Sequence, residues 1–323
     1  MAGAKAGLRP DGEGLRDGAA NSRVRVGHAH AKFAYVPLHF LFSLFRGTPA
    51  PGDSPELYVP EVDRQYGDLS FRRTDAEILR DYRMGLDARQ LDLMLALYAN
   101  VDPETGTARF GSLYEWGCLA AGEKGPDVSN YTRELTEPGK SRKRNPEKPA
   151  LNESRRIWID YYDKGRKRVP CVFVAPPVNL TLIKNAATGT TRFAQAELAF
   201  FLRHRLNGEG KLQHYRRVPL ACRKLLKEGG IKRVETAHML FFLYLFTRPG
   251  GRAITMSLET ICARIGIAHY LAAYQKKRAE KVIQDSLAAL IRQRVISDES
   301  GYQDGELTIY KNRFYFSNSE KEE

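Results

Sequence analysis

The last third of the chain, residues 234–316, constrains the fold most strongly, because helical and extended patterns alternate there in a fixed order. The apolar run 234–246 predicts a buried helix. The segment 247–251 (TRPGG) ends this helix, since proline and glycine both interrupt helices. Residues 253–257 (AITMS) are short and favour a strand. The region therefore begins with a helix that is followed closely by a strand.

A short second helix and a long third helix follow this strand. Ser257 stands where an N-cap is expected, and the helix over residues 258–265 stops at Gly266, a residue suited to a left-handed C-cap. Between about residues 270 and 294 the apolar positions fall three and four apart, so they share one helix face. These positions are Val282, Ile283, Leu287, Leu290 and Ile291.

The opposite face of the long helix is basic, starting with QKKR at residues 275–278. Beyond the helix, residues 307–310 and 314–316 predict the two strands of a hairpin. The order helix, strand, helix, long basic helix and hairpin is typical of a winged helix-turn-helix, in which the long helix enters a DNA major groove. The alternative is a small helical subdomain whose basic helix is only a solvated face.

A similar order appears nearer the N-terminus. Residues 87–100 predict an amphipathic helix, residues 107–110 a strand and residues 112–121 a second helix. This order predicts a first winged-helix-like module over residues 81–206. The predicted fold class is therefore α+β and helix-rich, with two winged helix-turn-helix modules in tandem.

The remainder of the first module carries a basic insertion at residues 123–152, which we interpret as a solvated loop. Residues 153–162 and 191–206 predict helices. Residues 171–174 and 178–183 predict strands that pair as a wing hairpin around Pro176 and Pro177. The basic residues expected beside a DNA backbone in this module are Arg155, Arg166, Lys167 and Arg168.

The flanking segments complete the predicted organisation. Residues 1–27 predict a disordered arm, because small and charged residues bury too little apolar area to offset chain entropy. An irregular N-terminal extension follows over residues 28–80. Residues 207–231 predict a basic amphipathic linker helix before the C-terminal winged helix at residues 232–317. Residues 318–323 form an acidic tail.

The composition favours a polyanionic partner. The chain has 51 lysines and arginines against 38 aspartates and glutamates, a formal net charge of +13, which points to nucleic acid before membrane. The four cysteines have no metal-ligand spacing and are expected to be free thiols in a reducing compartment. The apolar segment 33–45 is too short to span a bilayer. We expect a cytoplasmic protein without a membrane partner, metal, cofactor or catalytic residue, and hence no enzyme.

One enzymatic alternative is a tyrosine-dependent nickase. His28 and His30 flank one apolar residue, as in nucleases that hold a metal with a histidine pair on one strand. Tyr274 and Lys277 have the spacing of the tyrosine and lysine in such enzymes, where the tyrosine joins covalently to DNA. The two patterns lie far apart in the sequence, which is unfavourable for one compact site.

The whole pattern resembles plasmid replication initiator proteins of the tandem winged-helix type. Residues 258–267, residues 276–296 and the hairpin that ends at Phe316 carry the resemblance, and residues 87–121 carry it more weakly. Together they cover about half the chain. The resemblance implies binding to repeated double-stranded DNA sites in a plasmid origin and strand opening nearby. It also implies recruitment of a host helicase or initiator protein, and a homodimer formed through the first module. A winged-helix transcriptional regulator is the alternative function.

The residues themselves indicate which groups would contact DNA. Gln275 and Gln284 can reach base edges, and the basic side chains around them would neutralise phosphates. The segment 298–306 is acidic and would repel phosphate, so we interpret the tight turn at residues 310–313 as the wing. The full set expected in the C-terminal module is Tyr274, Gln275, Lys276, Lys277, Arg278, Lys281, Gln284, Lys311 and Arg313.

Overall fold

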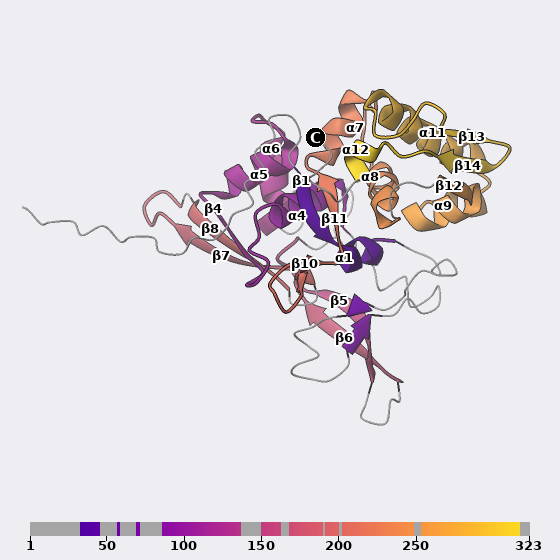
Figure 1. Cartoon of the computed structure of the whole chain (residues 1–323). Coiled ribbons are helices and arrows are strands. Elements are labelled where there is room, and N and C mark those ends of the chain that lie inside the picture. Colours follow the sequence, from indigo (N-terminus) through magenta and orange to yellow (C-terminus); the bar gives the residue numbers. More distant parts are fainter. Residues whose placement is uncertain are drawn as a thin grey trace, which may run out of the picture.

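The fold is taken from a computed structural model of the chain (Figure 1). The described residues are 33–45, 57–58, 69–71, 86–136, 150–162, 168–189, 191–199, 202–248 and 253–316. Several predictions fall outside these ranges: the arm at 1–27, the histidine pair at positions 28 and 30, Arg166 and Lys167, most of the basic part of the insertion, and the tail at 318–323.

Helices and antiparallel sheets alternate along the chain, in agreement with the predicted α+β class. Six of the eight elements in residues 86–199 form what we call the first module, in the order helix, strand, helix, helix, strand, strand, with β5 and β6 inserted between the last helix and the last two strands. Its sheet has the order β4-β8-β7, so the first strand pairs with the last. These elements are α4 (Ala88–Tyr98), β4 (Thr107–Phe110), α5 (Leu113–Ala121), α6 (Val128–Thr136), β7 (Val178–Lys184) and β8 (Thr191–Leu198).

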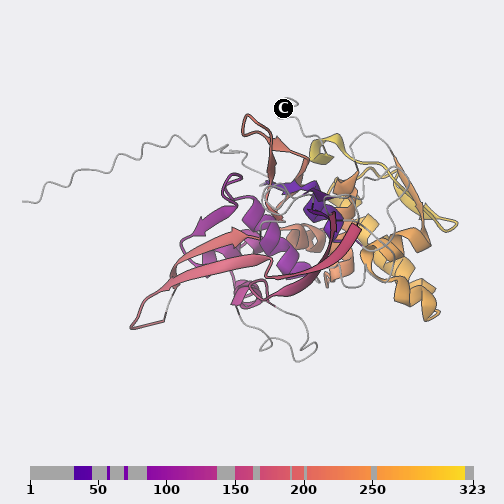
Figure 2. The same cartoon turned by 90° about the horizontal axis from the view of Figure 1, so that it is seen from below.

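The second module, residues 234–309, has the same order with one short extra helix. Its sheet has the order β12-β14-β13, so here too the first strand pairs with the last. Its elements are α8 (Thr236–Tyr244), β12 (Ile254–Ser257), α9 (Leu258–Ile265), α10 (Ala268–Ala272), α11 (Lys276–Arg292), β13 (Gly301–Gln303) and β14 (Glu306–Ile309). In Figures 1 and 2 the β7–β8 hairpin of the first module extends away from the second module.

Local sequence signals fix several helix ends. The Asp87 carboxylate accepts hydrogen bonds from the backbone N–H groups of Arg89 and Gln90, which starts α4. The Ser257 hydroxyl accepts from the N–H of Thr260, and Gly266 ends α9 with φ +82°. The predicted helix starts at Asp87 and Ser257 and the predicted stop at Gly266 are therefore confirmed.

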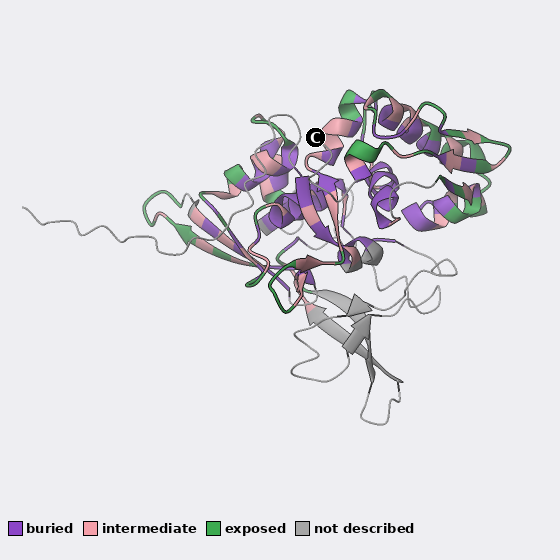
Figure 3. Cartoon of the chain, viewed as in Figure 1, coloured by how far each residue is buried: buried purple, intermediate pink, exposed green. Residues whose placement is uncertain are grey.

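The core is continuous across the two modules (Figure 3). In the first module the Trp116 ring stacks on Phe110, and its indole N–H donates to the Leu93 carbonyl. In the second module every residue of α8 from Ala237 to Tyr244 is buried. Helix α8 contacts both α9 and α11, so it supports them from behind.

Two segments predicted as helices are strands. Residues 153–162 contain β5 (Arg155–Tyr162), and residues 191–206 contain β8. In β8 the buried residues Ala194, Ala196 and Leu198 recur every second position, which is the period of a strand. The helical interpretation failed because it followed the large residues Phe193 and Leu198 and gave the small alanines no weight.

The strands around Pro176 and Pro177 exist, but they do not pair with each other. Strand β6 (Arg168–Ala175) pairs with β5, and β7 pairs with β8. The Pro-Pro segment instead carries the chain from one sheet to the next, since neither proline can donate a ladder hydrogen bond. The hairpin of the first module is therefore formed by β7 and β8. The sheet that contains β5 and β6 also holds β2 (Leu57–Tyr58) and β3 (Leu69–Phe71).

The insertion at residues 123–152 is not only a solvated loop. It contains α6, which buries Val128, Tyr131 and Leu135 against the rest of the first module. These residues fall three and four apart, so the helical period was present in the sequence. The prediction of a loop rested on the basic segment that follows these residues.

The predicted linker helix at residues 207–231 is helical only near its end. Strand β11 precedes that helix and pairs with β1, a long-range contact that no local pattern reveals. The N-terminal extension is therefore not wholly irregular. The elements concerned are β1 (Phe33–Pro37), α1 (Leu38–Ser43), β9 (Arg205–Leu206), β10 (Leu212–Gln213), β11 (Tyr215–Pro219) and α7 (Cys222–Glu228).

Candidate nucleic-acid interface

Helix α11 has one buried and one exposed face, as its sequence predicts. Val282, Ile283, Leu287 and Leu290 are buried, and Ile291 is half-buried. The opposite face is exposed along the helix and at its N-terminal end. The exposed residues, which we call the basic stripe, are Tyr274, Gln275, Lys276, Lys277, Arg278, Lys281 and Gln284. The structure thus brings together seven of the residues that the sequence predicted.

A corner precedes α11 and interrupts the long helix predicted over residues 270–294. At this corner Tyr274 adopts φ +57°, in the left-handed region. The Gln275 N–H donates to the Tyr270 carbonyl at 2.7 Å, and the Arg278 N–H donates to the Gln275 carbonyl at 2.9 Å. The corner separates the short α10 from α11 and leaves the first turn of α11 at the surface.

The stripe keeps its positive charges available. Lys276 lies 3.9 Å from the Glu280 carboxylate and Lys281 lies 3.6 Å from that of Asp285, but both ammonium groups are on mostly exposed side chains. Exposed ion pairs of this kind contribute little and exchange easily with a stronger anion. The Arg278 guanidinium lies 4.4 Å from the centre of the Tyr270 ring, which holds it in place.

The hairpin beside α11 is β13–β14, and its turn is at Asp304 and Gly305. Both turn residues have positive φ, +52° and +85°, as an Asp-Gly hairpin turn requires. The Tyr302 hydroxyl donates to Glu280, which ties the hairpin to α11. The prediction that residues 310–313 form the wing is therefore wrong, and residues 314–316 belong to α12 (Arg313–Phe316) rather than to a strand.

Lys311 has a structural position. Its ammonium donates to the backbone carbonyls of Leu245 and Arg248, at the C-terminal end of α8 and the 3-10 turn Leu245–Thr247 that follows it. Burial, and then the nearby charges of Arg216 and Arg248, lower the pKa of Lys311 to about 7. Arg313 begins α12, which packs on β11. The structure therefore does not bring Lys311 and Arg313 to the basic stripe.

The two described arginines of the first module also lie apart. Arg155 pairs with Ala175 at one end of the β5–β6 ribbon, and Arg168 pairs with Tyr162 at the other end. Eight residues of strand extend over ~25 Å, so these two residues do not form one cluster. In Figure 1 the ribbon projects from the lower side of the molecule, whereas α11 lies at the upper right.

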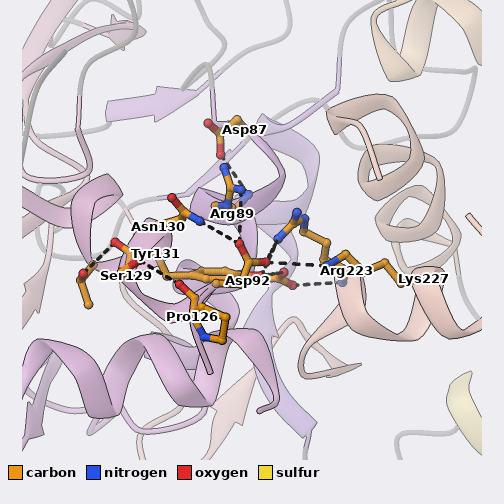
Figure 4. A network of polar contacts seen from close by, with 11 residues as sticks. Asp87, Arg89, Asp92, Pro126, Ser129, Asn130, Tyr131, Arg223 and Lys227 are labelled. Atoms are coloured by element: carbon orange, nitrogen blue, oxygen red, sulfur yellow. Dashed lines mark hydrogen bonds and ion pairs between the residues drawn. The ribbon is translucent and has the colours of Figure 1, made fainter. Parts of the chain in front are cut away.

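A polar network that sequence reasoning missed joins the first module to α7 (Figure 4). The Asp127 carboxylate accepts from Arg223 at 2.8 Å and from Asn130 at 2.9 Å, and Arg89 lies 3.5 Å away. Although partial burial opposes it, the Asn130 hydrogen bond and the neighbouring arginines lower the pKa of Asp127 to about 2. The sequence places Arg223 in a basic linker and gives it no partner. The contact is not visible in the sequence because Asp127 lies 96 positions away.

Asp92 lies at the centre of the same network and is fully buried. The Tyr131 hydroxyl donates to it at 3.0 Å, and the Arg223 backbone N–H lies 3.4 Å from its other oxygen. Burial outweighs these contacts and raises the pKa of Asp92 to about 7. A sequence signal existed, because an aspartate at position 92 stands among apolar residues of a helix.

The described part of the chain shows no group of three or more histidine, cysteine or acidic side chains that could hold a metal ion. The histidine pair of the nickase alternative lies outside the described residues. Among the described helices, none combines the length and the apolar character needed to cross a membrane. No family model, no curated protein and no solved structure matches this chain.

Proposed function

We propose that the two modules are winged helices and that the protein binds double-stranded DNA through α11 to initiate plasmid replication. The repeated order of elements supports this proposal. In the first module a helix, a strand and two further helices precede the inserted β5–β6 ribbon and a hairpin, and the second module has the same order with the short extra helix α10 and no ribbon. In both modules the first strand pairs with the last. This is the order expected of a winged helix-turn-helix, in which the third helix is presented to DNA.

The observation that carries the proposal is the exposed basic stripe on α11. The helix has 17 residues and is therefore ~26 Å long, enough to lie across a major groove ~12 Å wide. Its buried face is held by α8, so the exposed face is presented on a rigid support. Lys277 and Lys281 would contact phosphates, and Gln284 would reach base edges.

The charges of the hairpin indicate where the duplex would lie. Asp298, Glu299, Asp304 and Glu306 are exposed on or beside β13–β14. Carboxylates repel phosphate, so we place the DNA along the N-terminal half of α11 and away from the hairpin turn. This departs from winged helices whose wing follows the DNA backbone.

A binding experiment tests the proposal directly. The full chain is mixed with duplex DNA taken from beside its own coding region, at two salt concentrations and with random competitor duplex. We expect a retained specific complex that weakens steeply with salt. Absence of a complex with any duplex would refute DNA binding. Specific binding with no support of plasmid maintenance would instead favour the transcriptional regulator.

The double substitution Lys277→Ala with Lys281→Ala is expected to weaken duplex binding about tenfold. It should also reduce the slope of log affinity against log salt by about 2, because two phosphate contacts are lost. Titration of labelled duplex at several salt concentrations measures both quantities. The control Lys211→Ala with Lys232→Ala removes the same charge from exposed positions outside α11. It should change neither the affinity nor the salt slope appreciably. If the two double substitutions weakened duplex binding equally, α11 would not be the helix that contacts DNA.

A further inference from the structure

Tyr274 is the most exposed of the large hydrophobic side chains that the structure describes. Its exposed fraction is 98%, against 57% for the next, Ile183. Its backbone N–H donates to the Leu271 carbonyl, whereas its ring and hydroxyl have no partner among the described residues. Nothing in the described fold therefore gains from an aromatic ring at this position.

The backbone of Tyr274 is also unfavourable for its residue type. Its φ of +57° lies in the left-handed region, where glycine and asparagine are accommodated and a bulky aromatic residue is strained. The corner between α10 and α11 would form more easily with glycine. The chain thus keeps a strained and exposed tyrosine where folding alone favours a small residue, a combination typical of functional positions.

The position of Tyr274 indicates its partner. It precedes Gln275, the N-cap of α11, at the end of the basic stripe, with Lys277 three residues further on. The lysines and Arg278 already supply positive charge for phosphates. An uncharged ring beside them adds what those groups lack, which is an apolar surface suited to a base. In the major groove the apolar group is the methyl of thymine.

We infer that Tyr274 is a specificity-determining residue whose ring packs against a thymine methyl group in the major groove. This inference rests on the proposed DNA-binding function and adds a defined base to it. The ring would contribute to sequence discrimination, while the lysines of the stripe contribute affinity for any duplex. Strain at the corner would also fix the direction in which the ring projects.

Four proteins test the inference: wild type, Tyr274→Phe, Tyr274→Gly and the control His214→Gly. The wild-type chain first selects its site from a random duplex pool. His214 is exposed and has φ +49°, so its replacement relieves similar strain far from α11. Urea unfolding is measured for each protein, together with affinity for the selected site, for random duplex, and for the site with uracil in place of thymine.

We expect Tyr274→Gly to unfold at the same or higher urea concentration than wild type and to bind the selected site about tenfold more weakly. Its binding to random duplex should be unchanged. Tyr274→Phe and His214→Gly should bind as wild type, and uracil substitution should weaken wild type but not Tyr274→Gly.

An affinity of Tyr274→Gly for the selected site equal to that of wild type would overturn the inference. An equal loss of affinity in Tyr274→Phe would also overturn it, since the hydroxyl would then be the contact. Failure of the wild-type chain to select any site would refute the proposed function itself.

Discussion

Asp92→Asn is expected to remove a loss of stability that the wild-type protein undergoes between about pH 4 and pH 8. Asp92 is fully buried, and burial raises its pKa from 3.8 to about 7 in spite of the Tyr131 hydrogen bond and the Arg223 charge. An asparagine fills the same space and can still accept from the Tyr131 hydroxyl. It has no proton to lose, so its burial cost does not change with pH.

The direction of the effect follows from the two pKa values. Below pH 3.8 the carboxyl is protonated in both the folded and the unfolded chain and has no effect on unfolding. Between pH 3.8 and about 7 the unfolded chain ionises while the folded chain keeps its proton, which favours unfolding. At ~1.4 kcal/mol for each pH unit, the free energy of unfolding has fallen by ~4 kcal/mol above pH 7.

Urea unfolding of both proteins from pH 4 to pH 8 measures this effect as a difference curve. The difference is needed because burial also lowers the pKa values of His204 and His238, which favours the folded state as pH rises through 6.5. Asp127→Asn is the matched control from the same network. The low pKa of Asp127 stabilises the folded state above pH 3.8, and this contribution is lost only below that value. A difference curve for Asp92→Asn that is flat from pH 4 to pH 8 would contradict the expectation.

The second module was predictable from its sequence because each of its signals is local. Ser257 caps a helix, Gly266 ends it, and the apolar positions of α11 repeat every three or four residues. The corner at Tyr274 was not predictable, since a tyrosine gives no signal of positive φ. The hairpin turn was predicted at residues 310–313 because the segment 298–306 is acidic. The Asp304-Gly305 pair was the stronger turn signal, and the turn lies there.

In the first module the elements α4, β4, α5 and β7 follow from local patterns, but the pairing of its strands does not, because it joins residues far apart in the sequence. Strand β4 pairs with β8 across an inserted ribbon, and β1 pairs with β11, two strands that flank the module in the sequence. In β8 the buried residues alternate along the strand, but the large apolar residues of the segment 191–206 favoured the prediction of a helix. The basic stripe could be predicted because it lies on one helix, whereas the Asp92 and Asp127 network could not.

Gly229→Ala is expected to lower the free energy of unfolding by ~1–3 kcal/mol, the range of an overpacked core. Gly229 ends α7 with φ −70°, an ordinary value for alanine, so the backbone itself would not be strained. A Cβ atom there would lie 2.7 Å from both the carbonyl oxygen and the Cβ of Ala289 in α11. Two of the three nearest atoms are backbone, so they cannot move without shifting α11.

The expectation has a structural consequence because α7 joins the two modules. Arg223 anchors it to Asp127 in the first module, and the Arg292 guanidinium donates to the Gly229 carbonyl from the end of α11. A methyl group at position 229 would therefore separate the helix that carries the basic stripe from the support behind it. Gly208→Ala is the control, because a Cβ atom at Gly208 meets nothing within 4 Å, and its effect should stay within ~0.5 kcal/mol. Urea midpoints compare the two variants, and equal midpoints would mean that α7 and α11 do not pack as closely as their backbones indicate.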